Sequence, residues 1–174
     1  MTGRCVGPSS AKQRLAAGLA IATNSDHSDS VMLTQRSRYA LRAMLFLAEA
    51  PAGGKPIPMT RIAEAANVPR KFLELILADL REAKLIHSHR GKLGGYCLSR
   101  PTHLISLGDI IRVIEGPLAL VPCVSRTAYR ACADCRSEAD CAIRHAMMRV
   151  RDETARILDG TSLADATAEE LAVA

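Results

Sequence analysis

Several residue types are scarce in this chain of 174 residues. It has no Trp, and aromatic residues make up only 3% of it, so Leu, Ile, Val, Met and Ala must fill any core. No apolar run approaches the roughly 20 residues that a membrane helix needs. No Ser/His/Asp set, phosphate-binding glycine loop or paired-carboxylate motif stands out. We therefore expect a protein that is neither an enzyme nor associated with a membrane.

The N-terminal stretch AAGLAIA is too short for a convincing secretion signal, so we expect a cytoplasmic protein. Thiols stay reduced there, and clustered cysteines indicate a metal or redox site rather than disulfides. Of six cysteines, four fall close together, with the spacing C-x8-C-x2-C-x5-C: Cys123, Cys132, Cys135 and Cys141. Thiolates bind zinc or iron–sulfur clusters. A zinc ribbon usually has two CxxC knuckles and this chain has one, so the spacing favours an iron–sulfur cluster, with zinc as the alternative.

The remaining candidate ligands have simpler interpretations. We expect Cys97 to be a small core residue of a strand and His145 to be a surface histidine. His87, His89 and His103 form no recognisable ligand set in the sequence.

Charge is unevenly distributed, although the net charge is only +5. Residues 32–100 hold twelve basic and five acidic residues, whereas residues 101–174 hold eight basic and eleven acidic ones. A basic block in an otherwise acidic chain suggests a polyanion as partner.

Helical periodicity begins in this basic block. The apolar spacing predicts helices over 33–50, 59–68 and 70–84, with a break at PAGGKPIP and a tight turn before Pro69. The third helix is expected to bury five apolar residues, namely Phe72, Leu73, Ile76, Leu77 and Leu80. A short helix, a tight turn and a second amphipathic helix form a helix-turn-helix pattern; an ordinary helical hairpin is the alternative.

Two short strands, near 85–89 and 96–99, are predicted next around the glycine-rich tip RGKLGG. Such a basic hairpin directly after a recognition helix is a wing that can lie against phosphates. A helix over 106–116 then starts with a capping box at Ser106 and Asp109. The helix over about 141–159 has an apolar stripe that we expect to pair with a second copy, although packing on its own domain is the alternative. The stripe consists of Ile143, Ala146, Met147, Val150, Thr154, Ile157 and Leu158.

These patterns predict a mainly α fold with a small β-hairpin wing: a winged helix-turn-helix plus a long C-terminal dimerisation helix. The expected segments are a flexible N-terminal arm (1–31), a DNA-binding domain (32–116), a cysteine-rich cluster-binding loop (117–141), a dimerisation helix (142–160) and a tail (161–174).

The motifs MLTQRSRYALRAMLFLAE, IAEAANVPRKFLELILADLREAKLI, SHRGKLGGYCLS and ISLGDIIRVIEG, followed by the cysteine loop, resemble the IscR/NsrR/RirA-type winged-helix regulators, the Rrf-two family. The resemblance implies a homodimeric transcription regulator, such as a repressor, that binds a double-stranded DNA operator. It also implies a two-iron or four-iron cluster on the four clustered cysteines, whose loss or change through iron limitation, oxidation or nitric oxide alters operator binding. A zinc- or thiol-based redox regulator of the same fold is the alternative.

By motif position, the resemblance implies six DNA-contacting residues: Arg70, Lys71 and Glu74 on the recognition helix, and Arg90, Gly91 and Lys92 in the wing. Some positions depart from the family pattern. Tyr129 stands where a first family cysteine would fall, and Arg144 stands where some members place a histidine ligand. We therefore predict an all-cysteine site.

Overall fold

The structure is a computed structural model that describes residues 33–50, 55–91 and 94–173, with side chains described through Ala168. The chain divides into two units, Met1–Val31 and Met32–Ala174, and only the second is described below. The predicted flexible arm over 1–31 and the predicted DNA contact Lys92 lie outside the described residues.

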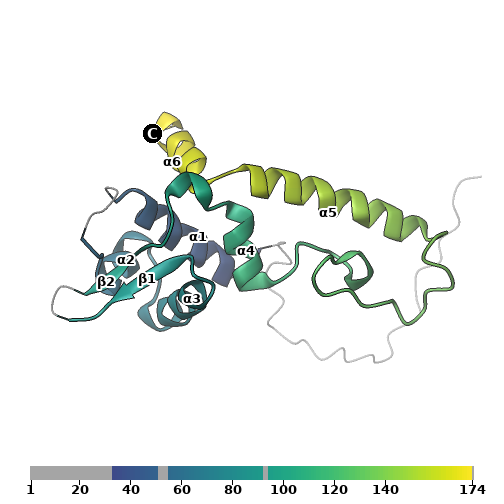
Figure 1. Ribbon diagram of the computed structural model, residues 1–174, viewed down its shortest axis with the longest axis horizontal. Coiled ribbons are helices and arrows are strands. Elements are labelled where there is room, and N and C mark those ends of the chain that lie inside the picture. Colours follow the sequence, from purple (N-terminus) through teal and green to yellow (C-terminus); the bar gives the residue numbers. More distant parts are fainter. Residues whose placement is uncertain (1–32, 51–54, 92–93, 174) are drawn as a thin grey trace, which may run out of the picture. The chain divides into compact units, whose positions relative to one another are not determined.

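The described residues form a mainly helical unit with one two-stranded antiparallel hairpin (Figure 1). The elements in chain order are α1 (Gln35–Ala48), α2 (Met59–Ala65), α3 (Arg70–Glu82), β1 (Ile86–His89), β2 (Gly95–Leu98), η1 (Thr102–Leu104), α4 (Leu107–Glu115), η2 (Pro122–Val124), α5 (Ala142–Gly160) and α6 (Leu163–Val173). The predicted fold class, a winged helix-turn-helix followed by a long C-terminal helix, is confirmed.

The core lies among α1, α2, α3, β1 and α4, which contact one another through apolar faces. Its largest fully buried side chains include Met44, Ile62, Leu73, Ile76, Leu77, Leu80, Ile86 and Ile110. The prediction that Phe72 is also buried is wrong, because 58% of this residue is exposed. Leu73 and Leu77 define the inward stripe of α3, and the neighbouring position 72 is turned about 100° away from it. The Phe72 ring instead lies near that of Tyr39, with centroids 6.4 Å apart.

Two side-chain clusters fix α4 in place. At its start, the Ser106 hydroxyl accepts from the Asp109 N–H, and the Asp109 carboxylate accepts from the Ser106 N–H, which is the predicted capping box. At its end, Glu115 Oε1 accepts hydrogen bonds from the Thr34 N–H (2.9 Å), the Thr34 hydroxyl (2.6 Å) and the Ser37 hydroxyl (2.5 Å). Burial alone would raise the pKa of Glu115, but these hydrogen bonds outweigh it and lower that pKa. Glu115 thereby holds the start of α1 against the end of α4.

Within the predicted tail (161–174), residues Leu163–Val173 form the helix α6. Leu163, the first residue of α6, is fully buried, and its N–H donates to the Ile105 carbonyl (2.9 Å). The α6 helix contacts α1 and η1, so it covers part of the winged-helix core.

The long helix α5 buries none of its residues within the described chain. Ile143 is 69% exposed and Ile157 is 55% exposed, and both belong to the predicted apolar stripe. None of the helices in the described ranges is long and apolar enough to cross a membrane. Helix α5 contacts α4 and η2, and Met147, Thr154 and Leu158 of the stripe are half-buried. The rest of the stripe is exposed in the described part of one chain, and its pairing with a second copy stays a prediction.

Candidate functional site

The turn between α2 and α3 has the short, locked geometry of a helix-turn-helix. Asn67 adopts φ 51°, a left-handed conformation that Asn tolerates better than most residues. The Val68 N–H donates to the Ala63 carbonyl (2.9 Å), and both residues are buried. The start of α3 is therefore fixed relative to α2 by the core rather than by its exposed side chains.

The predicted recognition residues Arg70, Lys71 and Glu74 all lie on the solvent side of α3. No carboxylate of the described residues forms an ion pair with Arg70 or Lys71. Their charged groups are therefore available to an external anion. The same exposed stretch carries Phe72 and Leu75, at 58% and 62% exposure.

The wing is attached directly to the end of α3. Lys84 adopts φ 58° after the helix, and the Leu85 N–H donates to the Leu80 carbonyl (2.9 Å). The Ser99 N–H, just after β2, donates in turn to the Leu85 carbonyl (3.1 Å). These bonds couple the position of the hairpin to that of the recognition helix, and α3 also contacts β1.

Three glycines are needed for the hairpin itself. A Cβ at Gly94 would lie 2.4 Å from the His89 carbonyl oxygen. Gly91 adopts φ 106°, which side chains disfavour. A Cβ at Gly95 would lie 2.3 Å from the Ile57 carbonyl oxygen, because Ile57 pairs with Tyr96 as a short bridge beside β2. Arg90 is exposed at the tip. Of the predicted wing contacts, the structure thus describes Arg90 and Gly91.

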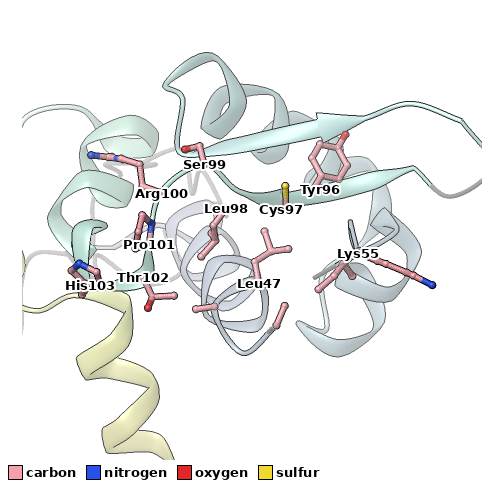
Figure 2. Close-up of a pocket in the computed structure, with 13 residues that line it drawn as sticks. Leu47, Lys55, Tyr96, Cys97, Leu98, Ser99, Arg100, Pro101, Thr102 and His103 are labelled. Carbon is pink, nitrogen blue, oxygen red and sulfur yellow. The ribbon is translucent and has the colours of Figure 1, made fainter. Parts of the chain in front are cut away.

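A hollow of about 590 Å³ lies between α1, β2 and the segment after it (Figure 2). Leu47, Ile57 and Leu98 supply apolar lining, and Arg100 and His103 lie on the same rim. None of the predicted DNA contacts or clustered cysteines lines it.

The cysteine loop connects α4 to α5 and is tied to α5 by arginines. Arg151 Nη1 donates to the Val124 carbonyl (2.5 Å), and Arg126 Nη2 donates to the Asp152 carboxylate (3.0 Å). Cys123, in η2, is 5% exposed, whereas Cys132 is exposed and Cys135 is half-buried. Cys141 is the N-cap of α5, and its Sγ accepts from the Arg144 N–H at 3.4 Å.

The four thiols lie near one another. The pKa of Cys132 is raised, first by a hydrogen bond with the Cys123 thiol, then by burial and by the charges of Cys123, Cys135 and Cys141. As the side chains stand, no three His, Cys, Asp or Glu residues of the described ranges surround a common point as metal ligands do. The loop therefore brings the four thiols close together but does not arrange them around one point as metal ligands.

The donor set fits a thiophilic centre, which thiolates bind well. Arg144, at the position of a possible histidine ligand, cannot coordinate a metal because its guanidinium stays protonated. Its Nε is buried and has no hydrogen-bond partner among the described residues, although Glu138 Oε2 lies 3.4 Å away. A buried N–H donor beside the cysteine loop suits an anionic sulfur acceptor. His145 is exposed, consistent with a surface residue.

Some features of these surfaces are not among the sequence predictions. The exposure of Leu75 follows from the helical register of α3, because position 75 is turned about 160° from the inward-facing Leu73. Cys97, expected in the core, is only half-buried and lies outside the core cluster. Strand alternation puts it on the opposite face from Leu98, which packs against the core.

Residues 33–169 match the model of the Rrf2 (Rrf-two) family, described as iron-dependent transcriptional regulators. The chain is 40% identical over 136 residues to an rrf2-like HTH-type transcriptional regulator of Rhodobacter capsulatus, covering 77% of this chain and 91% of that protein. It also resembles the solved structure of CymR, the global cysteine regulator of B. subtilis, with a TM-score of 0.65 and 33% identity over 80% of this chain and 98% of that one.

A second solved structure, IscR of T. potens, has a TM-score of 0.63 and is 28% identical over 81% of this chain and 89% of that one. The family match spans the described winged helix-turn-helix, the cysteine loop and α5. The role that these relatives share is regulation of transcription, which is not enzymatic. This chain therefore belongs to the Rrf2 family of transcriptional regulators.

Proposed function

We propose that this chain is a homodimeric DNA-binding regulator whose operator affinity depends on an iron–sulfur cluster held by Cys123, Cys132, Cys135 and Cys141. The observation that carries the proposal is the gathering of four thiols in one loop that caps α5, in a chain with an exposed, basic helix-turn-helix.

DNA would be contacted by α3 and the wing. Arg70 and Lys71 are exposed cations at the start of α3, where a recognition helix enters the major groove. Arginine and lysine contact phosphates or guanine edges, and the carboxylate of Glu74 accepts from cytosine. At the wing, Arg90 and Lys92 would contact phosphates, and Gly91 would allow close approach of the backbone.

The thiolates would act as the ligands of the cluster. Cysteine thiolates hold both two-iron and four-iron clusters. We expect iron limitation, oxidation or nitric oxide to remove or change such a cluster. Within the chain, Cys123 supplies a buried anchor on η2, and Cys141 supplies a ligand at the first turn of α5. Arg144, three residues after Cys141, offers a buried N–H donor that has no hydrogen-bond partner among the described residues.

The loop can influence DNA binding through α5 and α4. Ligation at Cys141 orders the start of α5, and Arg112 of α4 holds the far end of α5 through Asp159. Helix α4 contacts α1 and α3. If the stripe of α5 pairs with a second copy, a change at the loop alters the spacing of the two recognition helices, on which half-site binding depends.

A second candidate is a zinc- or thiol-based redox regulator without a cluster. The similarity to CymR favours it, since CymR of Staphylococcus aureus has been solved in an oxidized form and is 32% identical to this chain. In this candidate the thiols of Cys123 and Cys132, which lie near each other, would be oxidised to a disulfide by an external oxidant that takes up two electrons while both thiol protons are released.

Iron, acid-labile sulfide and zinc contents of anaerobically purified chain separate the two candidates. We expect iron and sulfide in about equal amounts, as in two-iron and four-iron clusters, with a brown colour. Serine in place of any one of the four loop cysteines should remove most of the iron and most of the sulfide. Cys97→Ser is the matched control, because it removes a thiol outside the loop, and it should keep both.

A colourless chain would replace the proposal by the zinc candidate if it holds one zinc that serine at the loop positions removes and that Cys97→Ser leaves in place. A metal-free chain whose operator binding follows thiol oxidation would replace it by the thiol candidate. Full cluster content in Cys123→Ser would overturn the ligand set.

A further inference from the structure

The wing carries three potential metal donors on the face that points away from the core. In the antiparallel register, His87 pairs with Cys97 and His89 pairs with Gly95. Paired residues, and residues two apart on a strand, share a face of the sheet. His87, His89 and Cys97 therefore lie on one side of the hairpin.

This side is accessible to a ligand. Ile86 and Leu98, on the opposite side, pack into the core, whereas His87 and His89 are exposed and Cys97 is half-buried. In Figure 2 the Leu98 side chain extends toward Leu47, and the Cys97 sulfur points away from it.

Two of the donors already have the separation of ligands on one ion. Cys97 Sγ lies 3.4 Å from His89 Nε2. With Zn–S of about 2.3 Å, Zn–N of about 2.0–2.1 Å and tetrahedral angles, sulfur and nitrogen ligands of one zinc ion lie about 3.6 Å apart. The observed distance also suits a thiol–imidazole hydrogen bond, so the third donor is what distinguishes a metal site from a simple pair.

His87 can supply that third donor by a change of side-chain rotamer. As the side chains stand, His87 lines a shallow hollow formed with Lys84, Ser99 and Arg100, and it does not surround a common point with Cys97 and His89. Directly opposite residues of an antiparallel pair have Cβ atoms only about 4.5–5.5 Å apart, so an ion beside Cys97 is within reach of His87. The residue is exposed, and its rotation displaces no core side chain.

We propose that His87, His89 and Cys97 form a surface site for a divalent zinc ion, separate from the loop cysteines. One thiolate and two imidazoles suit zinc, and the fourth position would be open to water. Binding releases the thiol proton, so a dication joined by one thiolate adds one net positive charge to the wing. That charge lies next to Arg90, in the hairpin that follows the recognition helix.

The test uses the full-length chain with serine at the four loop cysteines, so that its result does not depend on whether the loop holds a cluster. Cobalt(II) is the probe, because a thiolate ligand gives it a charge-transfer absorption, and zinc then competes for the site. We expect one cobalt per chain with this absorption. Cys97→Ser should abolish it. His87→Ala and His89→Ala should each weaken binding at least tenfold, because loss of a mere outer-shell partner of a metal ligand already costs about 10–100-fold.

His103→Ala is the matched control, since this exposed histidine lies outside the hairpin, in η1. It should bind cobalt as the parent does. Absorption that persists in Cys97→Ser, or affinity that changes less than about twofold in His87→Ala or His89→Ala, would overturn the three-ligand site. If the four-serine chain does not fold, Cys97→Ser in the wild-type chain must bind one cobalt fewer than His103→Ala, and equal binding would overturn the site.

Discussion

The ion pair between α4 and α5 gives a quantitative test of how the long helix is held. Arg112 donates from Nη1 to Asp159 Oδ1 (2.5 Å) and from Nη2 to Oδ2 (2.8 Å). Gly108 allows this approach, because a Cβ there would lie 2.0 Å from Asp159 Oδ1. We predict that Asp159→Asn weakens the contact by removing the charge while keeping the size of the side chain.

The expected coupling free energy of this ion pair follows from its geometry and from the exposure of its two side chains. Bidentate arginine–carboxylate pairs are stronger than single contacts, but these side chains are 36% and 46% exposed, and solvent screens their charges. The coupling free energy between Arg112 and Asp159 should therefore be about 1 kcal/mol. The Arg156–Glu153 pair on α5, at 70% and 66% exposure, is the control and should give about 0.3 kcal/mol.

The assay is a double-mutant cycle with Arg112→Gln and Asp159→Asn, measured by urea unfolding at one protein concentration. The hydrogen bond from Arg112 is the main cause that lowers the pKa of Asp159. A lowered carboxyl pKa stabilises the fold above the ordinary value, near 3.8, and this contribution disappears as the pH falls through the lowered value. A coupling free energy equal to that of the Arg156–Glu153 pair would refute the reasoning. So would a coupling free energy that persists at a pH below both the ordinary and the lowered pKa of Asp159.

Three further predictions concern the other surfaces. Glu115→Gln should destabilise the fold by about 1 kcal/mol through weaker hydrogen bonds to α1, measured by urea unfolding; an unchanged midpoint would contradict this. Replacing Arg70 and Lys71 together by Ala should weaken operator binding. It should also reduce the slope of log affinity against log salt concentration by the release of about two counterions, whereas Arg156→Ala should leave the slope unchanged. Equal slopes for the double variant and the wild-type chain would place the DNA contacts elsewhere. Ile157→Glu should convert a dimer to a monomer in sedimentation, and an unchanged mass would remove the α5 stripe from the dimer interface.

Much of the fold could be predicted from local patterns. The apolar spacing of α1 and α3 and the capping box at Ser106 each depend on neighbours within one or two turns. The boundaries of α3 and α4 accordingly fall within about two residues of those predicted, which is the usual uncertainty of helix ends.

The structure differs from the sequence predictions where contacts between residues far apart in the chain determine which side chains are buried. Leu163 is buried only because the chain returns to Ile105, and no local pattern reveals that contact. Phe72 belongs to an apolar run, but the core face of α3 is filled by its neighbours. Cys97 alternates correctly within its strand, yet the face that is buried is set by packing of Leu98 and Tyr96.

In the candidate site, too, some features could be predicted from the sequence and others depend on the fold. Spacing alone identified the four loop cysteines, and the exposure of Arg70, Lys71 and Glu74 agrees with their predicted role. The proximity of Cys123 to Cys132 needed the fold of η2, because eight residues separate them in the sequence.

The most direct measurement is the affinity of one preparation for its selected operator, first with the reconstituted cluster and then after anaerobic removal of the iron by a chelator. We predict that the two affinities differ about tenfold or more at equal salt, a free-energy difference of about 1.4 kcal/mol. We also predict that the chain with serine at all four loop positions shows a single affinity in both treatments. Equal affinities of the loaded and stripped wild-type chain would contradict the account.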